Sequence, residues 1–563
     1  MAYASNYKKH NGNAVSGAVT GRLARGRVGV AIACFVAAYA IMGARLVQYG
    51  IADVDSGTQF AAANETLAAR PDIVDRRGAI LAKDIRVSSL YGEPRRIIDA
   101  DEAVEALSGV LPDVDYAEWH RKLSSGAGFV WLRREITPDQ QAAVLALGIP
   151  GIGFRSETQR FYPGGSTASH ILGLVDIDNR GIAGMEKYVD DQGVGALQDL
   201  GLDVTADLAP VELTIDAGVQ FVVYDELKQA IERYQAIAAG AVILDAHTGE
   251  VVSMVSLPDY DPNNPFNAQD KDRLNRMSGG VYEMGSTFKT FTTAMALDAG
   301  AATLASRYDA TKPLRFGRFT INDFHGKGRV LSVPEIFIYS SNIGTAKMAD
   351  AVGIEEHRAF LKRLGLIDKM STQLPEVARP TEPQEWKKLN SITISFGHGM
   401  STTPLQTAVA AAALVNGGKL IQPTFLPRSR AEADQIARQV LSQKTSADMR
   451  YLFRLNVEKG SGRRADVPGL LVGGKTGTAE KVVNGRYSGD HRFNAFLSAF
   501  PMDDPQYVVL VIIDEPKPAE GQKSATAGLN AAPTVGNIIR RTAGLLGVMP
   551  DFNMGRDSLL VAQ

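Results

Sequence analysis

A serine and a lysine three residues apart form the first chemically useful pair in this sequence. Ser286 and Lys289 follow Gly285 and open a stretch whose apolar residues recur at helical spacing up to Gly300, which predicts the N-terminus of a helix. Residues three apart share one helix face, so a desolvated, unprotonated Lys289 amine can take the proton of the Ser286 hydroxyl. Ser-x-x-Lys also occurs by chance, as it does from Ser5 to Lys8, and the pair alone favours an ordinary surface helix.

A second polar group lies between two apolar helical segments. Ser340, Ser341 and Asn342 follow the segment that ends at Tyr339 and precede the one that begins at Ile343. A hydroxyl and a carboxamide in such a loop can relay a proton and hold a substrate amide. Taken alone, the tripeptide is better explained as an ordinary helix cap.

A third group follows an apolar run late in the chain. Lys475, Thr476, Gly477 and Thr478 come directly after the run from Leu470 to Gly474, so we expect them on or beside a sheet edge. Gly477 would allow a ligand backbone to approach closely, and one cation with two hydroxyls suits a carboxylate. Taken alone, these residues are equally typical of a solvated strand with a turn.

The order of the three motifs carries more weight than any one of them. Ser-x-x-Lys, Ser-x-Asn and Lys-Thr-Gly, in that order within one α+β domain, resemble the penicillin-binding proteins and the serine β-lactamases. The chain is similar to their transpeptidase domain over roughly residues 210 to 545. Further segments that carry this resemblance are Ala241 to Asp245, Thr248 to Glu250, Pro258 to Asn263 and Thr403 to Gln406.

Upstream segments resemble the pedestal of the class B penicillin-binding proteins, which have no glycosyltransferase domain. These segments are Asp75 to Gly78 with Ile80 to Ala82, Arg160 to Pro163, and Gly184 to Glu186. The residues between the predicted membrane helix and residue 210 are too few for a glycosyltransferase domain. The resemblance implies that Arg76, Arg160 and Glu186 form buried polar contacts that hold the pedestal together, which is a structural role.

The resemblance also implies the roles of a peptidoglycan D,D-transpeptidase. Ser286 would attack the carbonyl of the penultimate D-Ala of a stem pentapeptide, with Lys289 as base and the backbone amides of Ser286 and Thr478 as oxyanion hole. The other implied catalytic residues are Ser340, which passes a proton towards the leaving nitrogen, and Asn342, which holds the peptide amide. The implied substrate-binding residues are Lys475, Thr476, Gly477 and Thr478. An amine from a neighbouring stem would complete the cross-link, whereas attack by water would make a carboxypeptidase, and the motif residues do not separate the two.

The same resemblance implies binding partners, and two residues of the chain depart from the family pattern. The segment from Tyr507 to Lys517 looks like the division type of class B, with the elongation type as the alternative. The expected partners are a glycan polymerase of the shape, elongation, division and sporulation (SEDS) family, other division proteins, and β-lactams as covalent inhibitors. No cofactor, metal ion or nucleic acid is expected.

Met284 stands where the family usually has proline and His398 where it more often has glutamine, which leaves room for an altered cleft shape.

The composition bounds the architecture. Single domains usually stop growing at roughly 250 to 300 residues, so a chain of 563 residues predicts two or more folded units. A charged fraction of 22% and a formal net charge of -2 are ordinary for a globular protein and give no sign of a polyanion partner. Cys34 is the single cysteine, which excludes an intrachain disulfide and a cysteine-based metal site.

An uncharged run of 17 residues, from Val28 to Ala44, predicts one transmembrane helix. The residues before it are basic without any acid, so the positive-inside rule places the N-terminus in the cytoplasm. The resemblance then implies a single-pass protein of the cell inner membrane with a periplasmic catalytic domain. A cleaved signal peptide is the alternative, but its small-x-small triplet at Ala38 to Ala40 lies inside the apolar run.

The expected fold class is α+β. It is a penicillin-binding transpeptidase fold, an antiparallel sheet flanked by helices, preceded by an elongated strand-rich pedestal and one N-terminal transmembrane helix. The predicted parts are a basic cytoplasmic arm (residues 1–27), a transmembrane anchor (28–47), the pedestal of class B dimerisation type (53–209), the transpeptidase domain (210–546) and a tail (547–563). The predicted strands are Ala241 to Leu244, Val251 to Met254, Leu470 to Val472, Ala495 to Phe500 and Tyr507 to Ile513. The predicted helices include Ala217 to Tyr234, Pro404 to Val415 and Val535 to Leu546, and the pedestal shows no helix-long periodicity.

Two other functions remain open from the sequence. A membrane-anchored β-lactamase or β-lactam sensor shares the Ser-x-x-Lys and Lys-Thr-Gly motifs, but a lactamase is normally a soluble domain of about half this length. A division scaffold that needs no catalysis is the other alternative, and it leaves three correctly ordered motifs without a purpose.

Overall fold

The computed structural model describes residues 70–194, 208–317, 319–483 and 485–552, together with residues 36, 37, 39 and 40. Apart from the last four, these residues fall in one compact unit, Ala68–Gln563. Within the described residues, no helix is both long enough and apolar enough to cross a membrane. The predicted arm, nearly all of the predicted anchor at 28–47 and most of the predicted tail lie outside them.

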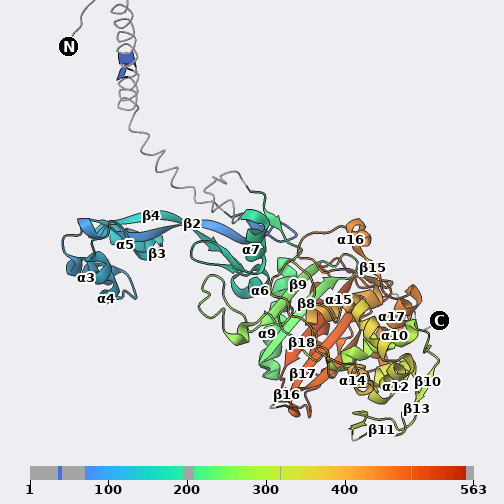
Figure 1. Cartoon of the computed structure of the whole chain (residues 1–563). Coiled ribbons are helices and arrows are strands. Elements are labelled where there is room, and N and C mark those ends of the chain that lie inside the picture. Colours follow the sequence, from blue (N-terminus) through green and yellow to red (C-terminus); the bar gives the residue numbers. More distant parts are fainter. Residues whose placement is uncertain are drawn as a thin grey trace, which may run out of the picture. The chain divides into compact units, whose positions relative to one another are not determined.

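A five-stranded sheet in the order β16-β17-β18-β8-β9 organises the C-terminal part (Figure 1). Every neighbouring pair in it is antiparallel. The strands are β8 (Ala238–Asp245), β9 (Val251–Leu257), β16 (Gly473–Val483), β17 (Arg486–Phe500) and β18 (Tyr507–Asp514). Early strand β8 pairs with late strand β18, so the first and last strands of the sheet along the chain are neighbours.

The position of β18 within the sheet explains why its sequence is apolar without a break. Val508, Leu510 and Ile512 lie in one hydrophobic core, and the alternating residues Val509, Val511 and Ile513 lie in a second core. Successive side chains of a strand point to opposite faces, so both faces of the sheet are covered. Helices α10 (Phe288–Asp298), α15 (Pro404–Val415) and α17 (Gln443–Lys459) contribute to the first core, and α9 (Ala217–Tyr234) and α18 (Ala531–Thr542) to the second.

Shorter elements complete this part of the chain. The remaining helices are α11 (Val333–Tyr339), α12 (Asn342–Val352), α13 (Ile354–Arg363), α14 (Lys388–Ile394) and α16 (Arg430–Ile436). Three small antiparallel pairs are β10 (Arg307–Asp309) with β13 (Val330–Ser332), β11 (Leu314–Phe316) with β12 (Phe319–Ile321), and β14 (Lys419–Leu420) with β15 (Arg438–Gln439). The fold is α+β, as expected.

Two predicted elements are displaced. Leu470 to Val472 do not form a strand; they lead into β16, and Leu471 has φ 40°, a left-handed conformation that a strand does not adopt. Helix α18 begins at Ala531 rather than Val535, because the Asn530 side chain accepts a hydrogen bond from the Ala531 amide and caps the helix earlier.

The N-terminal part is rich in strands, as expected, but it also holds helices that the sequence analysis missed. Its main sheet has the order β3-β2-β1-β7, with β4 paired to β2. The strands of this sheet are β1 (Ile73–Val74), β2 (Ile80–Gly92), β3 (Val130–Ile136), β4 (Ile152–Phe161) and β7 (Val211–Glu212). A separate antiparallel pair consists of β5 (Leu174–Val175) and β6 (Gly181–Ala183). The helices are α3 (Ala100–Val110), α4 (Tyr116–Leu123), α5 (Pro138–Leu147), α6 (Ser169–Leu172) and α7 (Gly184–Val189). Asp99, Asp115 and Thr137 cap α3, α4 and α5, and these helices close a small core of their own around Leu107 and Trp119.

A buried charge network stabilises this part. Glu186 Oε1 accepts a hydrogen bond from Arg160 Nε at 2.7 Å, and Glu186 Oε2 accepts one from Arg70 Nε at 3.0 Å. Arg160 and Glu186 therefore form the buried contact that was predicted for them. The expectation for Arg76 is wrong, because its side chain is partly exposed and pairs with Glu250, beside the β8–β9 turn, at 2.8 Å.

Candidate active site

Ser286 lies in a single turn of 3-10 helix, Gly285–Thr287, directly before α10. The prediction of a helix N-terminus at this serine is confirmed. Gly285 has φ 53°, and a Cβ added there would lie 2.9 Å from the Thr478 carbonyl oxygen. A Cβ added at Gly397 would lie 1.9 Å from the Gly285 carbonyl oxygen. The turn that carries Ser286 thus packs between β16 and the turn at residues 397–399. Neither Gly285 nor Gly397 has space for a side chain.

One serine hydroxyl joins the three motifs. Lys289 Nζ donates to Ser340 Oγ at 3.0 Å, and Lys475 Nζ donates to the same oxygen at 3.0 Å. Lys289 Nζ also donates to the Ser340 carbonyl at 2.6 Å. The two lysines come from α10 and β16, and the serine comes from the turn between α11 and α12, so only the tertiary fold brings them together.

Both lysines are buried, and this burial favours the uncharged form of their amines. Exposure is 2% for Lys289 and 0% for Lys475. Burial, and then the neighbouring Lys475 charge, hold the pKa of Lys289 well below its usual range. Burial lowers the pKa of Lys475 to about 7. An amine that is neutral near neutral pH can act as a general base, so the environment required of Lys289 is present.

The Ser286 hydroxyl does not form the expected contact with Lys289. Lys289 donates to Ser340 instead, and the Ser286 side chain makes no hydrogen bond within the described part of the chain. Catalytic hydrogen bonds are often long or absent without substrate, so this geometry does not remove Lys289 as a base. It leaves the hydroxyl available to an incoming carbonyl.

The Ser-x-Asn loop owes its shape to a residue that the sequence analysis missed. Ser340 ends α11 with φ 56°, and Ser341 caps α12 by accepting from the Gly344 amide. Asp323 accepts hydrogen bonds from Ser341 Oγ at 2.7 Å and from the Ile343 amide at 2.9 Å. The Asn342 side-chain amide donates to the Asn322 carbonyl at 2.8 Å. No local sequence signal marks Asp323, which lies 18 residues before Ser341.

The Lys-Thr-Gly residues lie on β16, at the edge of the large sheet, where the sequence placed them. Thr476 Oγ1 lies 2.7 Å from Ser461 Oγ, and Thr478 Oγ1 accepts from the Ala527 amide at 3.1 Å. A Cβ added at Gly477 would lie 2.5 Å from the Met284 carbonyl oxygen, so this glycine allows the nucleophile turn to approach the strand. Ser461 was not predicted from the sequence.

The comparisons with known proteins agree with this arrangement. The family model described as the penicillin-binding protein transpeptidase domain matches residues 239–540, which is more than half of the chain. A second model, described as the penicillin-binding protein dimerisation domain, matches residues 65–197. The chain belongs to the penicillin-binding protein transpeptidase family.

Three relatives show how far the similarity extends. The chain is 42% identical over 490 residues to the probable peptidoglycan D,D-transpeptidase FtsI of Caulobacter vibrioides, covering 85% of this chain and 82% of the relative. It is 34% identical over 506 residues to the probable peptidoglycan D,D-transpeptidase PenA of Neisseria meningitidis, covering 86% and 85%. Identity to the peptidoglycan D,D-transpeptidase FtsI of Escherichia coli is 28% over 516 residues, covering 85% and 84%.

In this penicillin-binding transpeptidase, the Glu283 carboxylate, which was not predicted, links the turn at residues 397–399 with β17 beside the nucleophile. Glu283 accepts from the Gly399 amide at 2.8 Å and lies 3.1 Å from His398 Nδ1. Tyr487, on β17, donates to the same carboxylate at 3.1 Å, and burial followed by the Glu283 charge raises the pKa of Tyr487 to about 12. His398, one of the two departures from the family pattern, is therefore part of the packing around the turn at 397–399.

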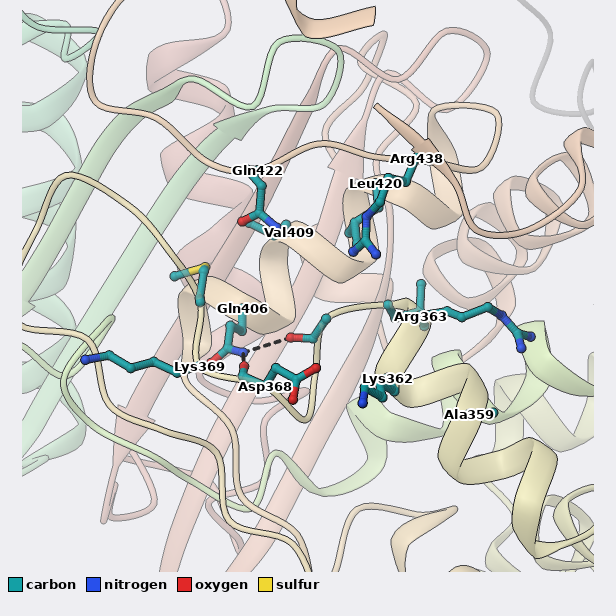
Figure 2. Close-up of a pocket in the computed structure, with 13 residues that line it drawn as sticks. Ala359, Lys362, Arg363, Asp368, Lys369, Gln406, Val409, Leu420, Gln422 and Arg438 are labelled. Atoms are coloured by element: carbon teal, nitrogen blue, oxygen red, sulfur yellow. Dashed lines mark hydrogen bonds between the residues drawn. The ribbon is translucent and has the colours of Figure 1, made fainter. Parts of the chain in front are cut away.

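Two cavities lie apart from these motifs. One, of about 550 Å³, lies beside α13 and α15. Its lining residues are drawn in Figure 2, among them Gln406, whose side-chain amide donates to the Gly365 and Asp368 carbonyls at 2.8 Å. A second, of about 870 Å³, is lined in part by residues of α6, β5 and β6. None of the motif residues lines either cavity, so neither is the site of the chemistry.

Proposed function

We propose that this penicillin-binding transpeptidase cross-links peptidoglycan stem peptides through an acyl-enzyme at Ser286, in septal wall synthesis. The observation that carries the proposal is the placement of two buried lysines on one serine hydroxyl beside the Ser286 turn. The printed names of the relatives, peptidoglycan D,D-transpeptidases, support the reaction. The likeness of the segment from Tyr507 to Lys517 to the division type supports the septal role, with the elongation type as the alternative.

In the proposed first step, Ser286 Oγ attacks the carbonyl of the penultimate D-Ala and loses its proton to neutral Lys289. The backbone amides of Ser286 and Thr478 stabilise the oxyanion. Ser340, which accepts hydrogen bonds from both lysines, donates its own proton to the leaving nitrogen and is reprotonated by a lysine. The terminal D-Ala then leaves.

The remaining roles concern binding. Lys475 as a cation, with Thr476 and Thr478, holds the donor carboxylate, while Gly477 lets the strand lie against the Ser286 turn. Asn342 holds the peptide amide. An amine of a neighbouring stem then attacks the acyl-enzyme and completes the cross-link, and β-lactams acylate the same serine.

The proposal includes a location and partners. Residues 28–47 anchor the chain in the inner membrane, with residues 1–27 in the cytoplasm and the catalytic part in the periplasm. The pedestal covers residues 53–209 in this proposal, the transpeptidase domain 210–546 and the tail 547–563. A SEDS-family glycan polymerase and other division proteins are the proposed partners.

The test is covalent labelling with a fluorescent penicillin. We expect the detergent-solubilised protein to take up a stable label on denaturing gels and Ser286→Ala to take up none. The matched control is Ser5→Ala, which alters the chance Ser-x-x-Lys in the N-terminal arm and should label like the wild type. Rapid loss of label from the wild type would indicate a β-lactamase, and the absence of label from folded wild type would contradict the proposed catalysis.

A further inference from the structure

The loop at residues 322–329, which we name the lip, joins β12 to β13 and is attached to the catalytic loop. Asp323 binds Ser341 Oγ and the Ile343 amide, and the Asn322 carbonyl accepts from Asn342. Three hydrogen bonds therefore connect the start of the lip with the Ser-x-Asn motif. A ligand held by the lip would lie next to the residues that act on the acyl group.

Two aromatic rings of the lip, those of Phe324 and His325, lie at the surface. Phe324 is 75% exposed, and its ring centroid lies 4.5 Å from that of His325 at an interplanar angle of 65°. Lys327 Nζ lies 4.7 Å from the ring centroid of Tyr339, which is 37% exposed. Exposed rings with a cation beside them suit the apolar face of a sugar together with an anionic group.

The sequence around the lip has more basic than acidic residues. From Lys312 to Arg329 the sequence has five lysines and arginines and a single acid, Asp323. That acid is already hydrogen-bonded to the Ser-x-Asn loop. Arg329 pairs with Glu335 at 2.6 Å, whereas Lys327 has no ion pair with any residue that the structure describes. Lys327 is therefore available to a carboxylate of a ligand.

The catalytic loop separates the lip from the proposed donor site. Ser340 receives Lys475 from β16, where the donor carboxylate is proposed to bind, while Ser341 and Asn342 contact the lip. A substrate on the lip would therefore lie next to the loop that carries Ser340. Its amine has to reach the acyl carbon from the position that the leaving D-Ala nitrogen has vacated, beside Ser340.

We infer that the lip binds the acceptor strand, a saccharide-linked stem peptide that carries free carboxylates and a primary amine. This inference rests on the proposed function and deepens it. In the second half-reaction, the amine nitrogen bonds to the acyl carbon and the ester bond to Ser286 Oγ breaks. The proton of the amine passes through Lys289 to Ser286 Oγ. Phe324 stacks on the saccharide or stem, and Lys327 pairs with a stem carboxylate.

The experiment separates the two half-reactions in the full-length protein. Acylation is followed with a fluorescent penicillin, and transfer is followed with a thioester donor peptide and either of two acceptors. The first acceptor is a soluble uncross-linked peptidoglycan strand, and the second is free D-alanine, which is too small to span the lip. For Phe324→Ala/Lys327→Ala we expect transfer to the strand to fall about tenfold relative to hydrolysis. Transfer to D-alanine and penicillin acylation should change by less than about twofold.

The matched control alters an exposed phenylalanine and lysine that line the cavity of about 870 Å³, which none of the motif residues lines. Phe266 is 85% exposed and Lys271 is exposed, and Phe266→Ala/Lys271→Ala should transfer to the strand as the wild type does. A second arm uses a strand whose stem carboxylates are amidated. Lys327→Ala alone should lower transfer to the free-carboxylate strand and leave transfer to the amidated strand unchanged.

Each outcome of the transfer and acylation assays leads to one conclusion. If the lip variants acylate normally and still transfer to the strand like the wild type, the inference is overturned while the proposed function stands. Equal losses for strand and D-alanine would also overturn it, because they would indicate a general defect in deacylation by amines. If the wild type takes up no penicillin, the proposed function fails and the inference falls with it.

Discussion

At the scale of single residues, the Ser340 hydroxyl links the two active-site lysines and can pass a proton to the substrate. Its Oγ accepts hydrogen bonds from Lys289 and Lys475, so its own proton is left to donate to a substrate atom. Two adjacent amines, both out of water, also disfavour each other's protonation. One of them can therefore stay neutral as a base, while the other can still become a cation when a carboxylate arrives.

The two lowered pKa values predict a maximum in the pH dependence of acylation. Protonation of Lys289 removes the base, so the second-order rate constant for a carboxylate-bearing β-lactam should fall at acidic pH. Lys475 has a pKa of about 7, so it loses its positive charge above about pH 7, and the rate constant should fall there as well. The measurement is that rate constant from pH 5 to pH 10.

The alkaline decline can be assigned with one variant. Arginine remains a cation throughout this range, so Lys475→Arg should lack the decline above about pH 7 even if its absolute rate is lower. A wild-type profile that stays flat above pH 7 would contradict the role given to Lys475. An unchanged decline in Lys475→Arg would assign it to another group.

At the scale of elements, the turn at residues 397–399 positions the nucleophile. Gly397→Ala would place a Cβ 1.9 Å from the Gly285 carbonyl oxygen, and because both partners are backbone the Ser286 turn must move. Displacement of a catalytic group by about 1 Å can cost about 100-fold in rate, so we expect at least that loss of penicillin acylation in folded protein.

The control for this substitution lies two residues away. Gly399 also has a positive φ, 88°, but a Cβ there would meet only two side-chain atoms at ordinary contact distance, Thr393 Oγ1 at 3.4 Å and Ile394 Cγ1 at 4.0 Å. Gly399→Ala carries a similar backbone strain without the collision, so its acylation rate should fall much less. Equal losses in the two variants would show that backbone strain, rather than the contact with Gly285, limits the rate.

The elements also show what a sequence can predict. Helices α9 and α15 have the predicted bounds, because α9 has a long helical pattern of 18 residues and α15 is followed by the stop signal Asn416-Gly417-Gly418. Helices α3 to α5 were missed because each is short, at 11, 8 and 10 residues, and each packs in a small local core. Periodicity over so few turns is hard to separate from that of a loop-rich module.

The residues of the active site also fall into those that the sequence predicts and those that only the structure shows. Ser286, Lys289, Ser340 and Lys475 were found because the order of their motifs is characteristic of the family. Asp323, Ser461 and Glu283 have no such motif, and their importance comes from contacts made by the tertiary fold. The direct partner of Lys289, Ser340 rather than Ser286, also depends on side-chain geometry that spacing along one helix does not define.

At the scale of the whole molecule, the buried charge network predicts a strong effect on stability. Glu186 has a fully buried side chain that receives hydrogen bonds from Arg70 and Arg160. Glu186→Gln keeps the shape but leaves these buried guanidinium groups short of a counter-charge, so the free energy of unfolding should fall by about 3 to 5 kcal/mol. Glu118→Gln, which removes an exposed pair with Lys122, should cost less than about 1 kcal/mol. Thermal unfolding of both variants provides the comparison, and similar losses would contradict a structural role for the network.

The last prediction concerns the relation between anchor and catalysis. Every described group of the site, from Glu283 to Ala527, lies within residues 70–552, and those residues belong to one compact unit. Deletion of residues 1–52 should therefore leave the penicillin acylation rate constant within about twofold, because the local geometry that sets the barrier is retained. If residues 28–47 are the anchor, the same deletion should release the protein from the membrane fraction. Retention in the membrane would contradict the anchor, whereas a large loss of acylation in soluble, folded protein would show that the N-terminal segment contributes to the site.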